Sequence, residues 1–246
     1  MRSPRGGSLV AIAGGVLAWW AVATIHVAGR PLVATPWETA SALPRMLPSL
    51  GADVLATSAR AGLGMLLGVV AGLAIGLGAA LVARAAPVVD GMLDFARSIP
   101  PVVVLPVFLL AFGYDDTARV GTVAAGCAWI MALSVTTAAG APRSLRRAML
   151  DLAGATRLEA LVWTQPWESL PVLVVGLRGS ASTAMVVTVV TEMIAGSEHG
   201  IGSRIISAQI AWDTTTLTTS VLAIGIVGYA ANLALRALES WARRLG

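Results

Sequence analysis

Side chains that could perform chemistry are few in this sequence. There are two histidines, one cysteine and no lysine, because all 17 basic residues are arginine. A metalloprotease would need a pair such as His-Glu-x-x-His, and an α/β-hydrolase would need Gly-x-Ser-x-Gly; neither pattern occurs. A nucleotide-binding P-loop is excluded too, since it needs Gly-Lys-Ser/Thr. We therefore expect no enzymatic activity, no metal and no cofactor on this chain.

The three chemically interesting residue positions have structural interpretations. Cys127 lies in an apolar stretch and is expected to be a small packing residue, and a single cysteine excludes a disulfide framework. His26 and His199 lie far apart in the sequence, at the ends of apolar stretches. Neither has neighbours typical of metal ligands, so both are expected to be solvated.

The elements that must position any site are membrane helices. Apolar residues make up 57% of the 246 and charged residues 12%, and the mean hydropathy is +0.80. A soluble domain would carry about a quarter charged residues, so the bilayer must be the solvent. A span needs about 20 apolar residues. We expect an all-α integral membrane protein with about six transmembrane helices, near residues 9–28, 54–82, 88–112, 120–140, 172–195 and 216–238.

The arginines predict an orientation. With the N-terminus in the cytoplasm, twelve arginines fall on the inner side and five on the outer side, which is the excess that the positive-inside rule expects. Both termini then lie in the cytoplasm, and the Pro-rich residues 31–48 lie outside. The first apolar stretch could be a secretory signal, but its core exceeds the usual length of about 7–15 residues. We expect an anchor helix and outer loop in residues 1–53 and a core domain in residues 54–246.

Two features inside the apolar stretches need an explanation. Glu192 lies near the outer end of its stretch; at a span centre its charge would cost about 2.5–3.5 kcal/mol, and less near the interface. A hydrated structural carboxylate is the simpler interpretation, and a role in a polar path or outer gate is the alternative. A run of glycines four residues apart predicts close helix packing, within the chain or against another subunit: Gly64, Gly68, Gly72 and Gly76.

A polar segment at about residues 141–171 interrupts the apolar pattern. Its first helix is predicted from Pro142, and Gly154 follows the last periodic residue, where a left-handed C-terminal cap favours glycine. Thr156 and Glu159 then have the spacing of a capping box, which predicts a second short helix. Two short helices could not be stable alone in water. This polar segment, which we call the knob, therefore needs a partner, either another protein or anionic lipid.

Several motifs, by their order and spacing, resemble permease subunits of bacterial ABC importers. Residues 151–156, Asp-Leu-Ala-Gly-Ala-Thr, are similar to the cytoplasmic EAA loop of that family. Residues 34–43 resemble its outer lead-in, and residues 97–101, Arg-Ser-Ile-Pro-Pro, resemble its Arg-Pro-Ile-Pro-Pro signature. Val-Val-Thr-Glu-Met at 189–193, followed by Gly-Ile-Gly at 200–202, resembles Val-Val-Ala-Glu-Met and Gly-Leu-Gly. The resemblance covers nearly the whole chain and is nearest to the nitrate/sulfonate/taurine branch.

The resemblance implies a type I ABC importer permease-like bundle in a bacterial inner membrane. Two copies, as a homodimer, would enclose one path for a small solute such as nitrate, a sulfonate or taurine. Membrane lipid, a periplasmic substrate-binding protein and cytoplasmic ATPase subunits are the implied partners; nucleic acid is not. The residues expected to couple to the ATPase are Asp151, Ala153, Gly154, Ala155, Thr156, Arg157, Leu158, Glu159, Leu161 and Val162. A small secondary transporter working as a dimer without an ATPase is the alternative, although no inverted repeat is evident.

Overall fold

The computed structural model describes residues 4–27, 29–81, 86–139, 149–150, 152–154, 156, 159 and 165–242. A short antiparallel hairpin pairs β1 (His26–Val27) with β2 (Arg30–Pro31). The helices are α1 (Pro4–Ala23), α2 (Pro36–Leu81), α3 (Ala86–Ser98), the 3-10 helix η1 (Pro101–Val104), α4 (Leu105–Phe112), α5 (Asp116–Ala139), α8 (Gln165–Ala195), α9 (Ile201–Ile210) and α10 (Thr214–Ala242).

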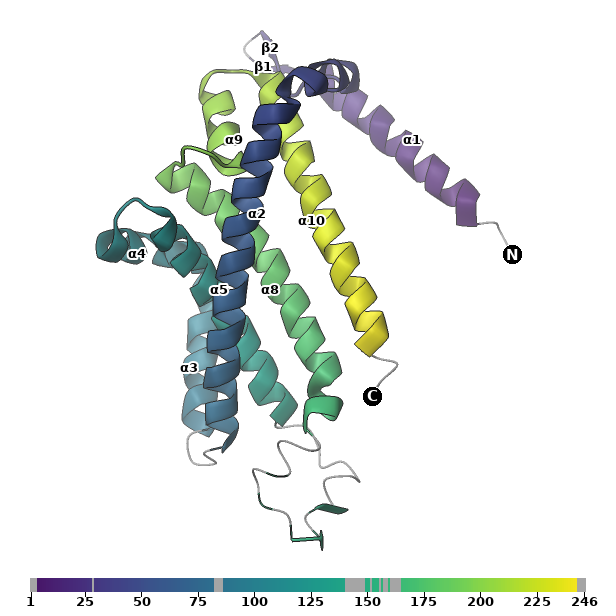
Figure 1. Ribbon diagram of the computed structural model, residues 1–246. Helices are drawn as coiled ribbons and strands as arrows, with labels where there is room; N and C mark the ends of the chain where they lie inside the picture. The colour runs from purple at the N-terminus through teal and green to yellow at the C-terminus, as the bar shows by residue number, and fades with distance from the viewer. Residues whose placement is uncertain are drawn as a thin grey trace.

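Helices α2, α5, α8 and α10 form the bundle (Figure 1). The β1–β2 hairpin, the start of α2, and α9 lie at one end, which we call the hairpin end. The last turn of α2 and the first turns of α3 and α8 lie at the opposite end, the loop end. Helix α1 runs away from the bundle, and α4 projects from its side (Figure 1).

The predicted all-α membrane fold is confirmed, but the number of spans differs from the prediction. Among the described residues, four helices are long and apolar enough to cross a membrane, or five if one bent pair counts as a single span. The first expected span corresponds to α1, whose apolar part, Ala13–Ala23, is shorter than a full span. The count of six is therefore not reached in the described part of the chain.

Helix α2 begins well before the expected span at residues 54–82. It has 46 residues and includes Pro44 and Pro48, so much of the stretch expected as an outer loop is helical. At 1.5 Å per residue its length is about 69 Å, more than twice the hydrocarbon core of about 30 Å. Its start is fixed by a capping box: the Thr35 N–H donates to Glu38 Oε2 (2.8 Å), and the Glu38 N–H donates to Thr35 Oγ1 (3.2 Å).

The third expected span, residues 88–112, is broken. Its two halves, Gly91–Ser98 and Pro101–Phe112, meet at an angle of 89°. Pro100 and Pro101 explain the break, because neither has an N–H to donate and a proline ring clashes with the preceding helical turn. Helix α3 therefore lies beside α2 and α5, whereas α4 projects sideways (Figure 1), with its Phe108 against Gly121 of α5.

The glycine run packs α2 against α5 of the same chain. A Cβ added at Gly72 would lie 2.5 Å from the carbonyl oxygen of Ala128, closer than real Cβ contacts. The other three glycines are as tightly placed, against Val123, Ala124 and Val135. We call this contact the glycine seam. It brings two helix backbones together, which is the close approach that glycines at this spacing permit.

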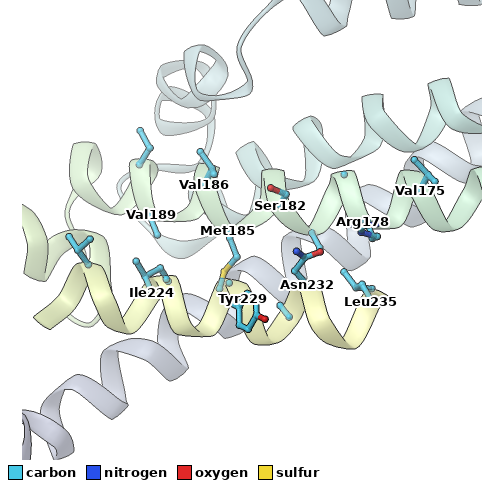
Figure 2. A pocket seen from close by; sticks show the side chains of 17 residues that line it. Val175, Arg178, Ser182, Met185, Val186, Val189, Ile224, Tyr229, Asn232 and Leu235 are labelled. Carbon is cyan, nitrogen blue, oxygen red and sulfur yellow. The ribbon is translucent and has the colours of Figure 1, made fainter. Parts of the chain in front are cut away.

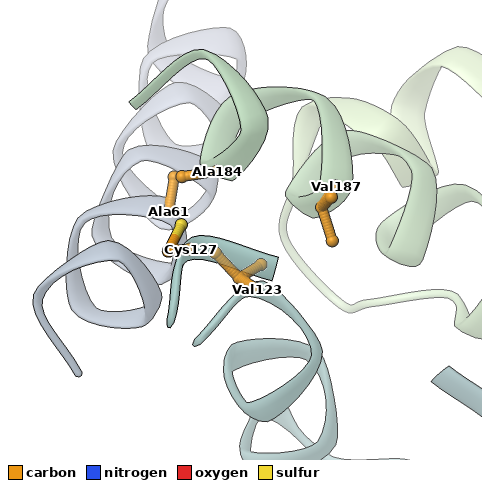
Figure 3. Packing of buried hydrophobic residues seen from close by; sticks show 5 residues of the cluster. All are labelled: Ala61, Val123, Cys127, Ala184 and Val187. Atoms are coloured by element: carbon orange, nitrogen blue, oxygen red, sulfur yellow. The ribbon is translucent and has the colours of Figure 1, made fainter. Parts of the chain in front are cut away.

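Beside the seam lies a small apolar core (Figure 3). Its members are Ala61 on α2, Val123 and Cys127 on α5, and Ala184 and Val187 on α8. Cys127 has no exposed surface and its thiol donates to the carbonyl oxygen of Ser180 (3.3 Å). The expectation that Cys127 is a packing residue is confirmed.

Candidate functional site

Glu192 lies near the end of α8 and has no exposed surface. The Thr57 hydroxyl lies 3.0 Å from both carboxylate oxygens, and Arg60 Nη1 donates to Oε1 (2.7 Å). The Gly202 N–H donates to Oε2 (2.9 Å). The expectation of a hydrated carboxylate at this position is therefore wrong: partners from α2 and α9 replace water, which is what a buried charge requires.

Arg60 extends the contacts of Glu192 to a second carboxylate. Its Nε donates to Asp116 Oδ1 (2.8 Å), and its Nη1 also donates to the carbonyl oxygen of His199 (2.7 Å). Arg119 donates to the same Asp116 oxygen (2.7 Å) and to the carbonyl oxygen of Gly196. These bonds join α2 and α5 to the turn that follows α8.

Asp53 binds the other side of the α9 segment. Its Oδ2 accepts from Arg204 Nε (2.5 Å), and its Oδ1 accepts from the Gly200 N–H (3.0 Å). His199 Nδ1 lies 3.7 Å from Asp53, and the histidine side chain is 64% exposed, in line with the solvated position expected for it. Three arginines thus meet three carboxylates in a balanced group, which we call the outer charge network: Asp53, Arg60, Asp116, Arg119, Glu192 and Arg204.

The network also caps α9. No side chain of α9 itself caps its start. Instead, the first three N–H groups, of Gly200, Ile201 and Gly202, donate to Asp53, Thr57 and Glu192 respectively. Helix N-termini leave such donors unpaired unless side chains accept them. A Cβ at Gly202 would collide with the carbonyl oxygen of Val189, so glycine is required there.

A turn at the hairpin end joins α9 to α10. The Asp213 N–H donates to the Ala208 carbonyl (2.9 Å) and the Trp212 N–H to the Gln209 carbonyl (3.2 Å), as in a Schellman motif. Trp212 has a φ of 56° at the position where glycine is usual, and Arg30 lies 5.2 Å from its ring centroid. Asp213 then caps α10: its carboxylate accepts from the Thr216 N–H (3.0 Å) and hydroxyl (2.6 Å), which lowers the pKa of Asp213.

The polar knob is described in part, at residues 149–150, 152–154, 156 and 159. Gly154 has a φ of +75°, which confirms the left-handed position predicted there. The capping box is also confirmed: the Thr156 N–H donates to Glu159 Oε2 (2.7 Å) and the Glu159 N–H donates to Thr156 Oγ1 (3.3 Å). The Thr156 amide, and next its hydroxyl, lower the pKa of Glu159. The remaining coupling residues predicted from the sequence lie outside the described ones: Asp151, Ala155, Arg157, Leu158, Leu161 and Val162.

An open groove of about 850 Å³ lies between α8 and α10 (Figure 2). Valine, isoleucine and leucine form much of its lining, and four polar side chains also reach it: Arg178, Ser182, Tyr229 and Asn232. Arg178 belongs to α8, one of the helices long and apolar enough to span a membrane. The groove faces away from the glycine seam, since it uses neither α2 nor α5.

Of the outer charge network, only Glu192 was predicted from the sequence as a candidate site residue. Neither Arg60 nor Asp53 was given a role. A usable signal was present: Asp53, Thr57 and Arg60 have i, i+4, i+7 spacing, and Gly64 continues the same helix face. Polar residues in register with a packing stripe predict a buried network where that helix meets its neighbours.

Known proteins resemble this chain in fold and in sequence. No family model matches the chain. The chain has the fold of a chain of the MetNI methionine ABC transporter in inward-facing conformations, with a TM-score of 0.72 and 20% identity over 80% of this chain and 98% of that one. A second crystal form of MetNI gives a TM-score of 0.68 at 21% identity. The architecture is that of a type I ABC importer permease.

The sequence relatives point to a branch of that class. The chain is 24% identical to the taurine transport system permease protein TauC of Escherichia coli over 90% of this chain and 82% of that protein. It is 28% identical to a putative aliphatic sulfonates permease, SsuC of Bacillus subtilis, over 73% of this chain and 65% of that protein. A probable ABC transporter permease of Brucella abortus is 27% identical over 78% of each chain. The resemblance to taurine and sulfonate permeases predicted from the motifs is confirmed.

Proposed function

We propose that this chain is the membrane permease subunit of an ATP-driven importer, and that two copies enclose a path for a small sulfonate or taurine-like solute. The observation that carries the proposal is the fold, which matches 98% of a chain of a solved ABC importer. Permease names among the sequence relatives support the same class. We further propose that the chain has no enzymatic activity and that ATP is hydrolysed on a separate subunit.

The knob is the surface we assign to the ATPase. Leu152 is 89% exposed and Met149 is 61% exposed, immediately before the left-handed Gly154. The capping box between Thr156 and Glu159 holds these two residues in a defined conformation. Exposed apolar side chains on a preorganised turn suit docking in a groove, because little conformational entropy is lost on binding.

The two ends of the bundle take opposite sides of the membrane in this proposal. The loop end, with the knob, lies in the cytoplasm together with both termini. The hairpin end faces the periplasm, where a substrate-binding protein delivers the solute. A single cysteine at Asp115, in a Cys127→Ala background, should react in intact cells with a membrane-impermeant thiol reagent. A cysteine at Met149 should react only after the cells are lysed. The reverse pattern would overturn this orientation.

Reconstitution tests the function and its alternative together. Proteoliposomes would contain the chain with its co-expressed ATPase and, on the outside, the binding protein loaded with taurine. We expect uptake that requires ATP in the lumen, and ATP hydrolysis that rises when loaded binding protein is added. Uptake driven by an ion gradient without ATPase or ATP would instead establish a dimeric secondary transporter.

A further inference from the structure

The broken span carries polar groups where lipid cannot solvate them. Asp94 and Arg97 form an ion pair on α3 (Arg97 Nε to Asp94 Oδ1, 2.9 Å), and their side chains are 59% and 61% exposed. Arg97 follows Ala86, at the loop end, by eleven residues, or about 17 Å along the helix. Measured from the loop end, the pair therefore lies about half the thickness of a hydrocarbon core of about 30 Å along α3.

The backbone at the break also has polar groups that lipid cannot solvate. In an unbroken helix the Arg97 carbonyl would accept from residue 101, but Pro101 has no N–H. The Ile99 N–H donates to the Ala96 carbonyl (3.1 Å), three residues back instead of the four of an α-helix. The Ser98 hydroxyl turns back to the Asp94 carbonyl (3.0 Å). Non-helical backbone at membrane depth is tolerated where protein buries it or where it lines a water-filled cavity.

Helix α3 has three distinct sides. Leu93 is 5% exposed and packs toward the bundle. Val88, Met92 and Phe95 have i, i+4, i+7 spacing and are 63–71% exposed, which makes a side suited to lipid. Asp94, Arg97 and Ser98 are exposed on a third side, which we call the polar face of α3. Charged side chains at this depth face a water-filled cavity or a bundle interior.

We propose that the polar face of α3, with the break above it, lines the aqueous solute path, and that Arg97 and Asp94 contact the solute. This inference rests on the proposed permease function. A zwitterion that carries a sulfonate and an ammonium group can pair with Arg97 and Asp94 together. A plain alkanesulfonate would leave Asp94 without a partner. The geometry thus favours an aminosulfonate such as taurine over an alkanesulfonate of equal length.

Accessibility tests the path separately from transport. Ser98→Cys and Met92→Cys, each in a Cys127→Ala background, place a thiol on the polar face and on the lipid side of α3. In the assembled complex, a charged methanethiosulfonate should modify Ser98→Cys at least about tenfold faster, because the reactive thiolate forms in water. Equal rates, or faster modification of Met92→Cys, would overturn the assignment whether or not the complex proves to be an importer.

Solute preference tests the charge pair. Uptake of taurine and of ethanesulfonate would be measured in the same proteoliposomes, so that the binding protein's own preference cancels between variants. Asp94→Asn should raise the ethanesulfonate-to-taurine ratio about tenfold, as expected when one desolvated charge partner is lost. Arg97→Gln should lower the uptake of both solutes. An unchanged ratio in Asp94→Asn would reject the solute contact, while loss of ATP dependence in the wild type would reject the permease function instead.

Discussion

The outer charge network and the polar face of α3 both place charges within apolar helices, but they treat those charges differently. In the network, Glu192 has no exposed surface and both of its carboxylate oxygens have donors. On α3, Asp94 and Arg97 pair with each other and keep more than half of their surface exposed. The network joins four helices, whereas the α3 pair joins two residues one helical turn apart.

This difference separates structural charge from charge that is available to other molecules. A buried carboxylate with its partners in place has no capacity left for a solute, and removing one partner leaves the other unpaired. An exposed pair contributes little to stability but can exchange its partner. For Glu192 the sequence left two interpretations open, a hydrated structural carboxylate and a role in the path or outer gate; in the structure its carboxylate accepts from α2 and α9.

Removing Glu192 should have the largest effect on stability. Glu192→Ala leaves the Arg60 guanidinium without its buried partner, and we expect a loss of about 3–5 kcal/mol. Asp94→Ala, the matched change on α3, should cost about 0–1 kcal/mol. Thermal unfolding of the two purified variants in the same detergent would measure both. Similar shifts in the unfolding midpoint would show that the two regions do not differ in the way described.

Glycines offer a second comparison of the same regions. In Gly202→Ala the new Cβ would meet Val189 and Glu192, so we expect a loss of about 1–3 kcal/mol. Gly91, in the middle of α3, has nothing within 4 Å of such a Cβ. Gly91→Ala should therefore stabilise the helix by about 0.5–1 kcal/mol. Opposite signs are the expected result, and the same unfolding assay would detect them.

A third variant extends the comparison to the knob, where the feature tested is the left-handed backbone conformation of Gly154 and not a charge. Gly154→Val forces a β-branched residue into a left-handed conformation, at a cost of about 1–2 kcal/mol. We expect normal insertion but loss of the ATPase during affinity purification of the complex. Gly154→Asn, which tolerates this conformation, should retain the ATPase. Recovery of the ATPase with the valine variant would count against the docking assignment.

The smallest expected effect concerns an exposed cap. Asp213→Ala should cost about 1 kcal/mol near neutral pH, because Asp213 caps α10. The pKa of Asp213 is lowered from its usual 3.8, so its contribution is fully present above that value and is lost as the pH falls through the lowered pKa. The wild-type and variant unfolding midpoints should differ equally at about pH 7 and about pH 5. Convergence already at pH 5 would contradict this assignment.

Predictions from local sequence patterns were confirmed where a few neighbouring residues determine the structure. The capping box at Thr156 and Glu159, the left-handed Gly154 and the buried Cys127 all depend on short-range chemistry or on simple hydrophobicity. The general class followed from composition and from motifs that span most of the chain.

Features that depend on several helices could not be predicted in the same way. Hydropathy treats residues 88–112 as one apolar run, so it misses an 89° bend caused by two adjacent prolines. It also starts the second span at residue 54, although α2 already begins at Pro36. The burial of Glu192 depends on Arg60, more than a hundred residues earlier, and no local pattern links the two.

The glycine seam has a mechanical consequence. From Gly64 to Gly76 the seam runs for about 18 Å at 1.5 Å per residue, and along that length the glycines of α2 lie directly against carbonyl oxygens and Cβ atoms of α5. Such a joint has few alternative packings, so α2 and α5 should behave as a fixed frame during transport. Relative movement is then left to α10, whose contact with α8 includes the open groove. A cross-link between α2 and α5 should leave the transport cycle running, whereas one between α8 and α10 should stop it.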